Sequence, residues 1–140
     1  MPSVFTRIIE GEIPGTFVWR DEQCAAFMSI NPLRRGHTLV VPRMEIDHWF
    51  DCPPDLMDHL MGVSREIGAA QQQVFQPVRI GLMIAGLEVP HLHIHLVPID
   101  GVHDLDFANA AVSVERDDLE DAASAIRQFL HSRGLSGVAD

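Results

Sequence analysis

The sequence predicts one α+β domain in which helices flank a five-stranded, mainly antiparallel sheet. Two observations support this prediction. Five short segments rich in β-branched and other apolar residues are each bounded by turn residues. Three other segments repeat apolar residues at intervals of three and four, as amphipathic helices do. With 140 residues, the chain fits a single domain spanning 1–140 with a core of ordinary size.

The N-terminal half is predicted to form a short helix and three strands. Ser3 is suited to cap a helix over 3–10, and Gly11 to end it. Proline after the third strand stops it, because proline cannot donate to a sheet. The three strands are expected over 16–20, 24–29 and 37–41, with the first two joined as a hairpin.

The C-terminal half is predicted to form the longest helix, two strands and a last helix. The longest helix begins at Pro53 or Pro54, because proline is favoured in a first turn. Its apolar face consists of Leu56, Leu60, Val63, Ile67, Ala70 and Val74. Strands are expected over 78–84 and 91–99, and a helix with an acidic first turn over about 115–133.

Composition and charge narrow the class of protein. The chain is 46% hydrophobic and 21% charged, which is typical of a globular protein. Its formal net charge of −10 argues against a nucleic-acid partner, and the lack of a long apolar run argues against a membrane partner. The two cysteines, Cys24 and Cys52, form no close pair, and no secretory signal is recognisable, so we expect a cytoplasmic protein.

The segment HLHIHLVPI over residues 91–99 alternates histidine with aliphatic residues. Successive side chains of a strand point to opposite faces, so His91, His93 and His95 are predicted to point the same way at steps of about 6.6 Å. The aliphatic residues between them then face the core. Three imidazoles in a row suit either a metal ion or a phosphate group.

The rest of the sequence favours phosphate. A metal site needs a further ligand, and the chain has neither a close cysteine pair nor a His-Glu-x-x-His motif. Phosphate chemistry needs one neutral imidazole as nucleophile, and two flanking imidazoles oppose protonation of His93. We therefore expect a phosphoramidate to form on His93 and to be cleaved by water. His37, at the start of a predicted strand, is a candidate for positioning that nucleophile.

These residues resemble the histidine-triad (HIT) family of nucleotide hydrolases and transferases. The family signature, His-φ-His-φ-His-φ-φ with φ apolar, is matched over 91–97, and the resemblance extends over 4–98. It implies the HIT-like fold and a homodimer. It also implies that His93 attacks the α-phosphate of a nucleotide, that His91 and His95 bind the phosphate and the leaving group, and that His37 is the fourth histidine of the site.

The resemblance further implies a nucleotide pocket. Five residues are assigned to its apolar base-binding wall, although a place in the ordinary core is equally open for each: Val4, Phe5, Ile8, Phe27 and Ile30. Ser29 stands where an Asp or Asn commonly contacts the ribose. Glu88 stands where many relatives have Ser or Thr near the phosphate, and a carboxylate there repels a polyphosphate unless it faces away or is paired.

One branch of the family has Cys-x-x-Cys near the N-terminus as part of a structural zinc site. Ser3 and Thr6 occupy these places here, and Glu45 stands where a further histidine often appears. The sequence therefore argues against structural zinc. No cofactor is expected to be required, and the resemblance leaves Mg²⁺ open for polyphosphate substrates.

The function we expect is that of a nucleotide-binding hydrolase or nucleotidyl transferase acting at the α-phosphate through a nucleotidyl-histidine intermediate. Its substrate is expected to be a nucleoside phosphoramidate or a dinucleoside polyphosphate, with a purine base on the resemblance alone. Two alternatives stay open. Ser29 and Glu88 are compatible with a nucleotide-binding module of little or no turnover, and the triad with a metal-dependent enzyme of another kind.

Overall fold

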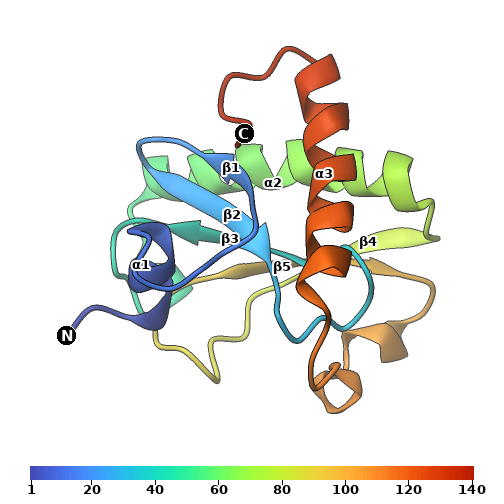
Figure 1. The fold of residues 1–140 in the computed structure, drawn as a ribbon. Helices are drawn as coiled ribbons and strands as arrows, with labels where there is room; N and C mark the ends of the chain where they lie inside the picture. Colours follow the sequence, from blue (N-terminus) through green and yellow to red (C-terminus); the bar gives the residue numbers. More distant parts are fainter.

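One antiparallel sheet of five strands organises the molecule (Figure 1). The computed structural model describes all residues, 1–140. The strand order is β1-β2-β3-β5-β4, and every neighbouring pair is antiparallel, which confirms the predicted fold class. The strands are β1 (Phe17–Arg20), β2 (Cys24–Met28), β3 (Thr38–Pro42), β4 (Arg79–Met83) and β5 (Ile94–Ile99).

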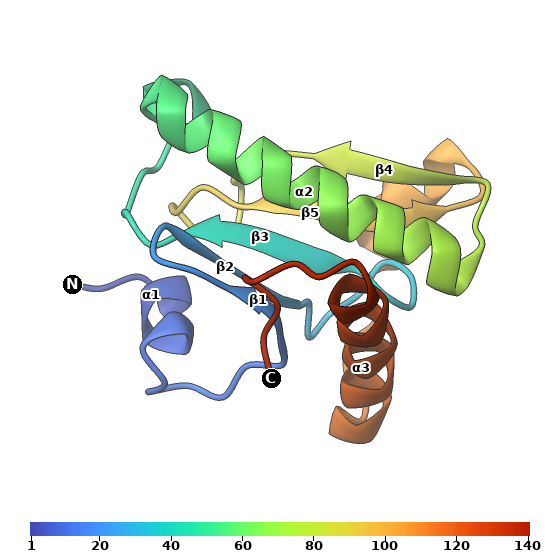
Figure 2. The same cartoon turned by 90° about the horizontal axis from the view of Figure 1, so that it is seen from above.

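Three α-helices cover the two faces of this sheet. They are α1 (Val4–Ile9), α2 (Pro54–Phe75) and α3 (Arg116–Ser132). The main core lies where α2 and α3 pack on one face, and a smaller core lies under α1 on the other face (Figure 2). None of the helices combines the length and apolar character that a membrane span requires.

Helix α2 begins at Pro54, as its sequence predicts. The predicted apolar face is buried from Leu56 to Ala70, whereas Val74, near the end of the helix, is only half-buried. The same helix also buries the polar Gln71, whose amide donates to the carbonyl oxygens of Gly36 (2.9 Å) and Leu96 (3.0 Å). These bonds tie the residue before His37 to the strand that carries His95.

The predicted histidine strand over 91–99 is shorter in the structure, because β5 begins only at Ile94. The register of β5 on β3 ends with the pair Val40 and Ile94. Before this point the backbone N–H of Leu92 donates instead to the carbonyl of Ile46, at 2.6 Å. Residues 91–93 are therefore held by a loop contact. Their side chains still alternate, because Leu92 lies in the main core and Phe5 packs edge-on against both His91 and His93.

Candidate active site

Two cavities share the histidines near the start of β5. Their volumes are about 270 Å³ and about 110 Å³, and both are lined by Glu88, His93, His95 and Phe107. The larger cavity also has walls from α1, from the loop after β2 and from the segment around Phe107. These walls include Val4, Phe5, Ile8, Ser29, Ile30, Asn31 and Ala110.

His93 presents an unprotonated nitrogen to these cavities. Its Nδ1 lies 2.7 Å from the backbone oxygen of His91. A carbonyl only accepts hydrogen bonds, so Nδ1 of His93 carries the proton and Nε2 keeps its lone pair. Nε2 has no hydrogen-bond partner within the protein and is not sealed from solvent. Burial lowers the pKa of His93, against the opposing effects of the His91 carbonyl and Glu88, so the ring is neutral at pH 7.

His95 presents a protonated nitrogen beside it. The backbone N–H of Leu33 donates to Nδ1 of His37 at 3.0 Å, so a neutral His37 carries its proton on Nε2. That nitrogen lies 2.9 Å from Nδ1 of His95 and donates to it. The proton of a neutral His95 is therefore on Nε2, which has no partner within the protein and is not sealed from solvent.

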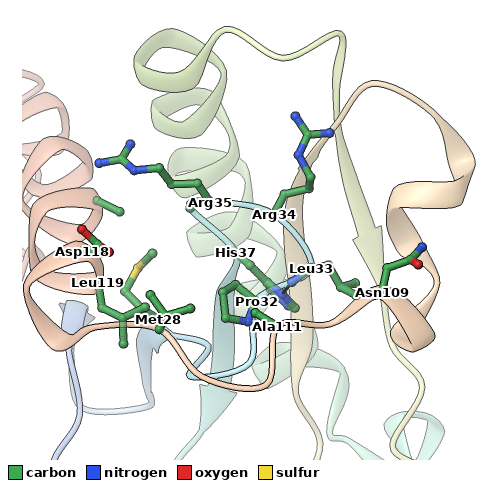
Figure 3. Close-up of a pocket in the computed structure, with 13 residues that line it drawn as sticks. Met28, Pro32, Leu33, Arg34, Arg35, His37, Asn109, Ala111, Asp118 and Leu119 are labelled. Carbon is green, nitrogen blue, oxygen red and sulfur yellow. Dashed lines mark hydrogen bonds between the residues drawn. The ribbon is translucent and has the colours of Figure 1, made fainter.

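Burial keeps this pair of rings neutral. It lowers the pKa of His37 to about 3 and that of His95 to about 4, and the neighbouring histidines act in the same direction. Figure 3 shows His37 beside Leu33 at the edge of another cavity, of about 500 Å³, between the loop before β3 and α3. His93 and His95 do not line that cavity.

His91 lies behind the site. Its side chain is fully buried, its Nε2–H donates to the carbonyl of Pro42 at 2.8 Å, and its Nδ1 lies 2.5 Å from the hydroxyl of Ser3. It lines neither of the two cavities. It lies on the same side of the chain as His93, because the Phe5 ring packs edge-on against both rings, with centroids 5.8 Å and 4.8 Å away.

The predicted base-pocket residues lie at the larger cavity with one exception. Val4, Phe5, Ile8 and Ile30 line it, together with Ser29 and Glu88. Phe27 does not, because its ring is buried between those of Phe5 and Phe17, with centroids 5.7 Å from each. For Phe27 the ordinary core position is the correct one.

Sequence reasoning missed Asn31 and Phe107. The Phe107 ring packs edge-on against His95, with centroids 5.2 Å apart. The amide of Asn31 donates to the carbonyls of Ala111 (3.0 Å) and Val112 (2.8 Å), which fixes the segment that carries Phe107. That segment has no apolar periodicity, so nothing in its sequence placed it at the site.

The positions that the resemblance connects with structural zinc do converge in space. The backbone N–H of Ser3 donates to the Glu45 carboxylate at 2.6 Å, and the hydroxyls of Ser3 and Thr6 lie 3.3 Å apart, beside His91. Zinc in structural sites prefers thiolate and imidazole ligands to neutral hydroxyls. This donor set therefore does not fit structural zinc, and hydrogen bonds connect its members instead.

One other group of metal-type side chains lies between the β1–β2 hairpin and α2, away from the triad, and consists of Asp21, Cys24 and His59. Oδ2 of Asp21 already accepts hydrogen bonds from Trp19 and His59, both at 2.7 Å. Burial raises the pKa of Cys24, so its thiol stays protonated. Hydrogen bonds explain these contacts, because Asp21 closes the β1–β2 turn and joins it to His59 on α2.

Acid is expected to destabilise the protein at a pH that is still too high to protonate its carboxylates. The folded-state pKa values of His37 and His95 lie well below the ordinary 6.5, so between these values the unfolded chain binds more protons than the folded one. Their stabilising effect is full above about pH 6.5 and is lost as the pH falls towards 4. Scanning calorimetry is expected to show Tm falling by about 5 °C or more between pH 7.5 and pH 5.

The control for this measurement is His131→Gln, which removes an exposed histidine and is expected to keep the same slope. His37→Gln is expected to flatten it. A Tm that is constant from pH 7.5 to pH 5 would mean that these rings are not held neutral by burial.

Comparison with known proteins identifies the family. The family model described as HIT domain matches residues 10–102. An uncharacterized HIT-like protein of Methanocaldococcus jannaschii is 37% identical over 99 residues, which are 68% of this chain and 77% of the relative. A crystal structure of a HIT-like protein from Bartonella henselae has a TM-score of 0.80 at 28% identity and covers 90% of this chain and 94% of its own.

A HIT family hydrolase from Legionella pneumophila has a TM-score of 0.58 at 30% identity, over 69% of this chain and 91% of that one. The region that the HIT domain model matches, residues 10–102, includes α2, all five strands and the histidines of the site. The chain therefore belongs to the HIT family.

Proposed function

We propose that the protein is a nucleotide hydrolase or nucleotidyl transferase that acts at the α-phosphate through a covalent nucleotidyl-His93 intermediate. The observation that carries this proposal is the pair of nitrogens at the cavities. An unprotonated Nε2 of His93 and a protonated Nε2 of His95 belong to rings 4.8 Å apart. The first is suited to attack phosphorus, and the second to donate to a phosphate oxygen or a leaving group.

In the first step, the lone pair of His93 Nε2 forms a bond to the α-phosphorus while the bond from phosphorus to the leaving group breaks. The leaving group takes the bonding electrons and accepts a proton from solvent, while the Nε2–H of His95 donates a hydrogen bond to a phosphate oxygen and keeps its proton. Positive charge develops on the His93 ring, and the His91 carbonyl at Nδ1 stabilises it. This contact strengthens as the bond forms, which is the property that accelerates a reaction.

In the second step, water attacks the same phosphorus and the phosphorus–nitrogen bond breaks. Its electrons return to His93 Nε2, and a proton of the water passes to solvent. The products are a nucleoside monophosphate and the enzyme in its starting protonation state. A nucleophilic acceptor other than water makes the same step a transfer.

The substrate class we propose first is a nucleoside phosphoramidate. The apolar wall formed by Val4, Phe5, Ile8 and Ile30 is suited to one base, and the purine preference comes from the family resemblance. Glu88 lies at the cavities beside both histidines, where its charge disfavours substrates with further phosphates. Dinucleoside polyphosphates are therefore the second class to test.

A single-turnover experiment tests the covalent step. Excess protein is mixed with adenosine 5′-phosphoramidate labelled at phosphorus and quenched in alkali, in which phosphorus–nitrogen bonds to histidine survive. We expect label on the protein that rises and then decays as adenosine monophosphate appears. Binding without transfer of label to the protein would favour the alternative, a nucleotide-binding module, for which the Glu88 carboxylate at the cavity is the supporting observation.

The phosphoramidate reaction is expected to need no divalent metal. Imidazole and backbone groups supply the nucleophile and a hydrogen-bond donor, and a single phosphate brings little charge. Turnover measured in roughly 5 mM EDTA is expected to stay within about two-fold of the untreated rate. The matched assay uses a dinucleoside polyphosphate, a substrate class for which the use of Mg²⁺ is an open question. Complete loss of phosphoramidate turnover on chelation, restored by zinc, would revive the metal-dependent alternative.

We also propose that two copies associate through β4. This strand lies at the edge of the sheet, and Leu82 on it and Val78 just before it are exposed. An unpaired edge with exposed apolar side chains is a template for pairing with another strand. The molecular mass in solution, measured by sedimentation equilibrium, distinguishes a dimer from a monomer.

A further inference from the structure

The N-terminus of α1 is joined directly to the first histidine of the triad. Ser3 caps the helix, because its hydroxyl accepts the backbone N–H of Thr6 at 3.1 Å. The same hydroxyl lies 2.5 Å from Nδ1 of the fully buried His91, and the backbone N–H of Ser3 donates to Glu45 at 2.6 Å. One small side chain therefore caps the N-terminus of α1 and contacts the ring of His91.

The direction of each hydrogen bond here follows from chemistry. The Pro42 carbonyl accepts from Nε2 of His91, so that nitrogen carries the proton. Burial lowers the pKa of His91, so the ring is neutral and Nδ1 has a lone pair. No backbone N–H is bonded to Nδ1 of His91, so the Ser3 hydroxyl donates its proton to that nitrogen. The ring of His91 is thereby held at both nitrogens, in one tautomer and one orientation.

We propose that Ser3 is a positioning residue for the reaction at His93. By fixing the His91 ring, it keeps the His91 backbone carbonyl in line with Nδ1–H of His93, 2.7 Å away. This inference rests on the proposed function and extends it to a residue outside the cavities. Ser3, Thr6 and Glu45 do not form a zinc ligand set, and their hydrogen bonds hold the same junction together.

The contact also connects two parts of the site. Helix α1 carries Phe5 and Ile8 on the wall of the larger cavity. The Phe5 ring packs edge-on against His93, with centroids 4.8 Å apart. Loss of the Ser3 hydroxyl is therefore expected to disturb the alignment of His93 more than the shape of the base pocket, because Phe5 and Ile8 keep their packing in the smaller core.

The test compares three variants in full-length protein. Ser3→Gly removes the hydroxyl, and glycine is tolerated at a helix N-cap. It is expected to lower kcat for the phosphoramidate by about 10- to 100-fold, with KM and the Kd of adenosine monophosphate within about three-fold. Ser3→Thr keeps a hydroxyl and is expected to restore kcat to within about three-fold. Ser113→Gly is the matched control, because it removes an exposed serine hydroxyl that lines neither cavity of the site, and it is expected to keep the kcat of the parent.

A kcat of Ser3→Gly within about two-fold of the parent would overturn the proposal, as would a parallel loss of kcat and nucleotide affinity. Nitrogen-15 NMR of the histidine rings gives a second measurement that needs no turnover. The parent protein is expected to hold His91 as the Nε2–H tautomer at pH 7, and Ser3→Gly to lose this single tautomer. Unchanged His91 and His93 signals in Ser3→Gly would refute the role of Ser3 even in an active enzyme. An inert parent with Ser3-dependent signals would instead refute the proposed function.

Discussion

Replacing His93 with alanine is expected to lower the turnover of a nucleoside phosphoramidate by several orders of magnitude while nucleotide binding stays measurable. The substitution removes the nitrogen that forms the covalent bond, so the reaction loses its two-step route. The apolar cavity wall from α1 and Ile30 stays in place. Single-turnover kinetics and calorimetric titration with adenosine monophosphate measure the two effects separately.

Two further proteins sharpen this result. His93→Gly leaves space where the ring was, and free imidazole is expected to recover part of the lost turnover by attacking phosphorus itself. His103→Ala removes an exposed histidine that lines neither cavity of the site and is expected to react like the parent. Near-native turnover in His93→Ala would show that the central histidine is not the nucleophile.

Much of the fold follows from periodicity within single segments. The apolar face of α2 is buried from Leu56 to Ala70, and Leu92, Ile94 and Leu96 lie in the main core. These positions depend on a pattern that each element carries in its own sequence. The five strands and three helices were therefore predictable, with each predicted end at most three residues from the observed one.

The arrangement around His93 depends on contacts between distant segments. The strand ends early where Leu92 bonds to the carbonyl of Ile46, and bonds to Pro42 and Ser3 hold the His91 ring outside the cavities. Asn31 fixes the segment of Phe107 by bonds to carbonyls 80 and 81 residues away. A local pattern carries no information on such bonds, so the histidines were predictable as a cluster, whereas the exclusion of His91 from the cavities was not.

Glu88 is expected to act as a charge filter on the substrate. It lines both cavities beside His93 and His95, and its charge acts to raise the pKa of His93, so the carboxylate is close enough to influence the reacting group. At an effective dielectric constant near 20, two like charges about 6 Å apart repel by about 3 kcal/mol. Because Glu88 is exposed, salt and solvent reduce this value.

Glu88→Ser is therefore expected to raise kcat/KM for a dinucleoside polyphosphate by about ten-fold, and to change kcat/KM for a phosphoramidate by less than about three-fold. Both values are measured at one fixed ionic strength. Glu88→Gln separates charge from size and is expected to behave like Glu88→Ser. Glu22→Gln changes the net charge equally at an exposed position in the β1–β2 turn and is expected to change neither value.

The ratio of kcat/KM for the two substrate classes identifies a charge filter. A general effect on folding or on the reactivity of His93 alters kcat/KM for both classes alike. A charge that acts on the additional phosphates alters one class alone, and higher salt is expected to reduce the difference between parent and variant. Equal changes for both substrates would mean that Glu88 is directed away from the phosphates. The preference for a single phosphate would then have to come from the shape of the cavities that His93, His95 and Phe107 line.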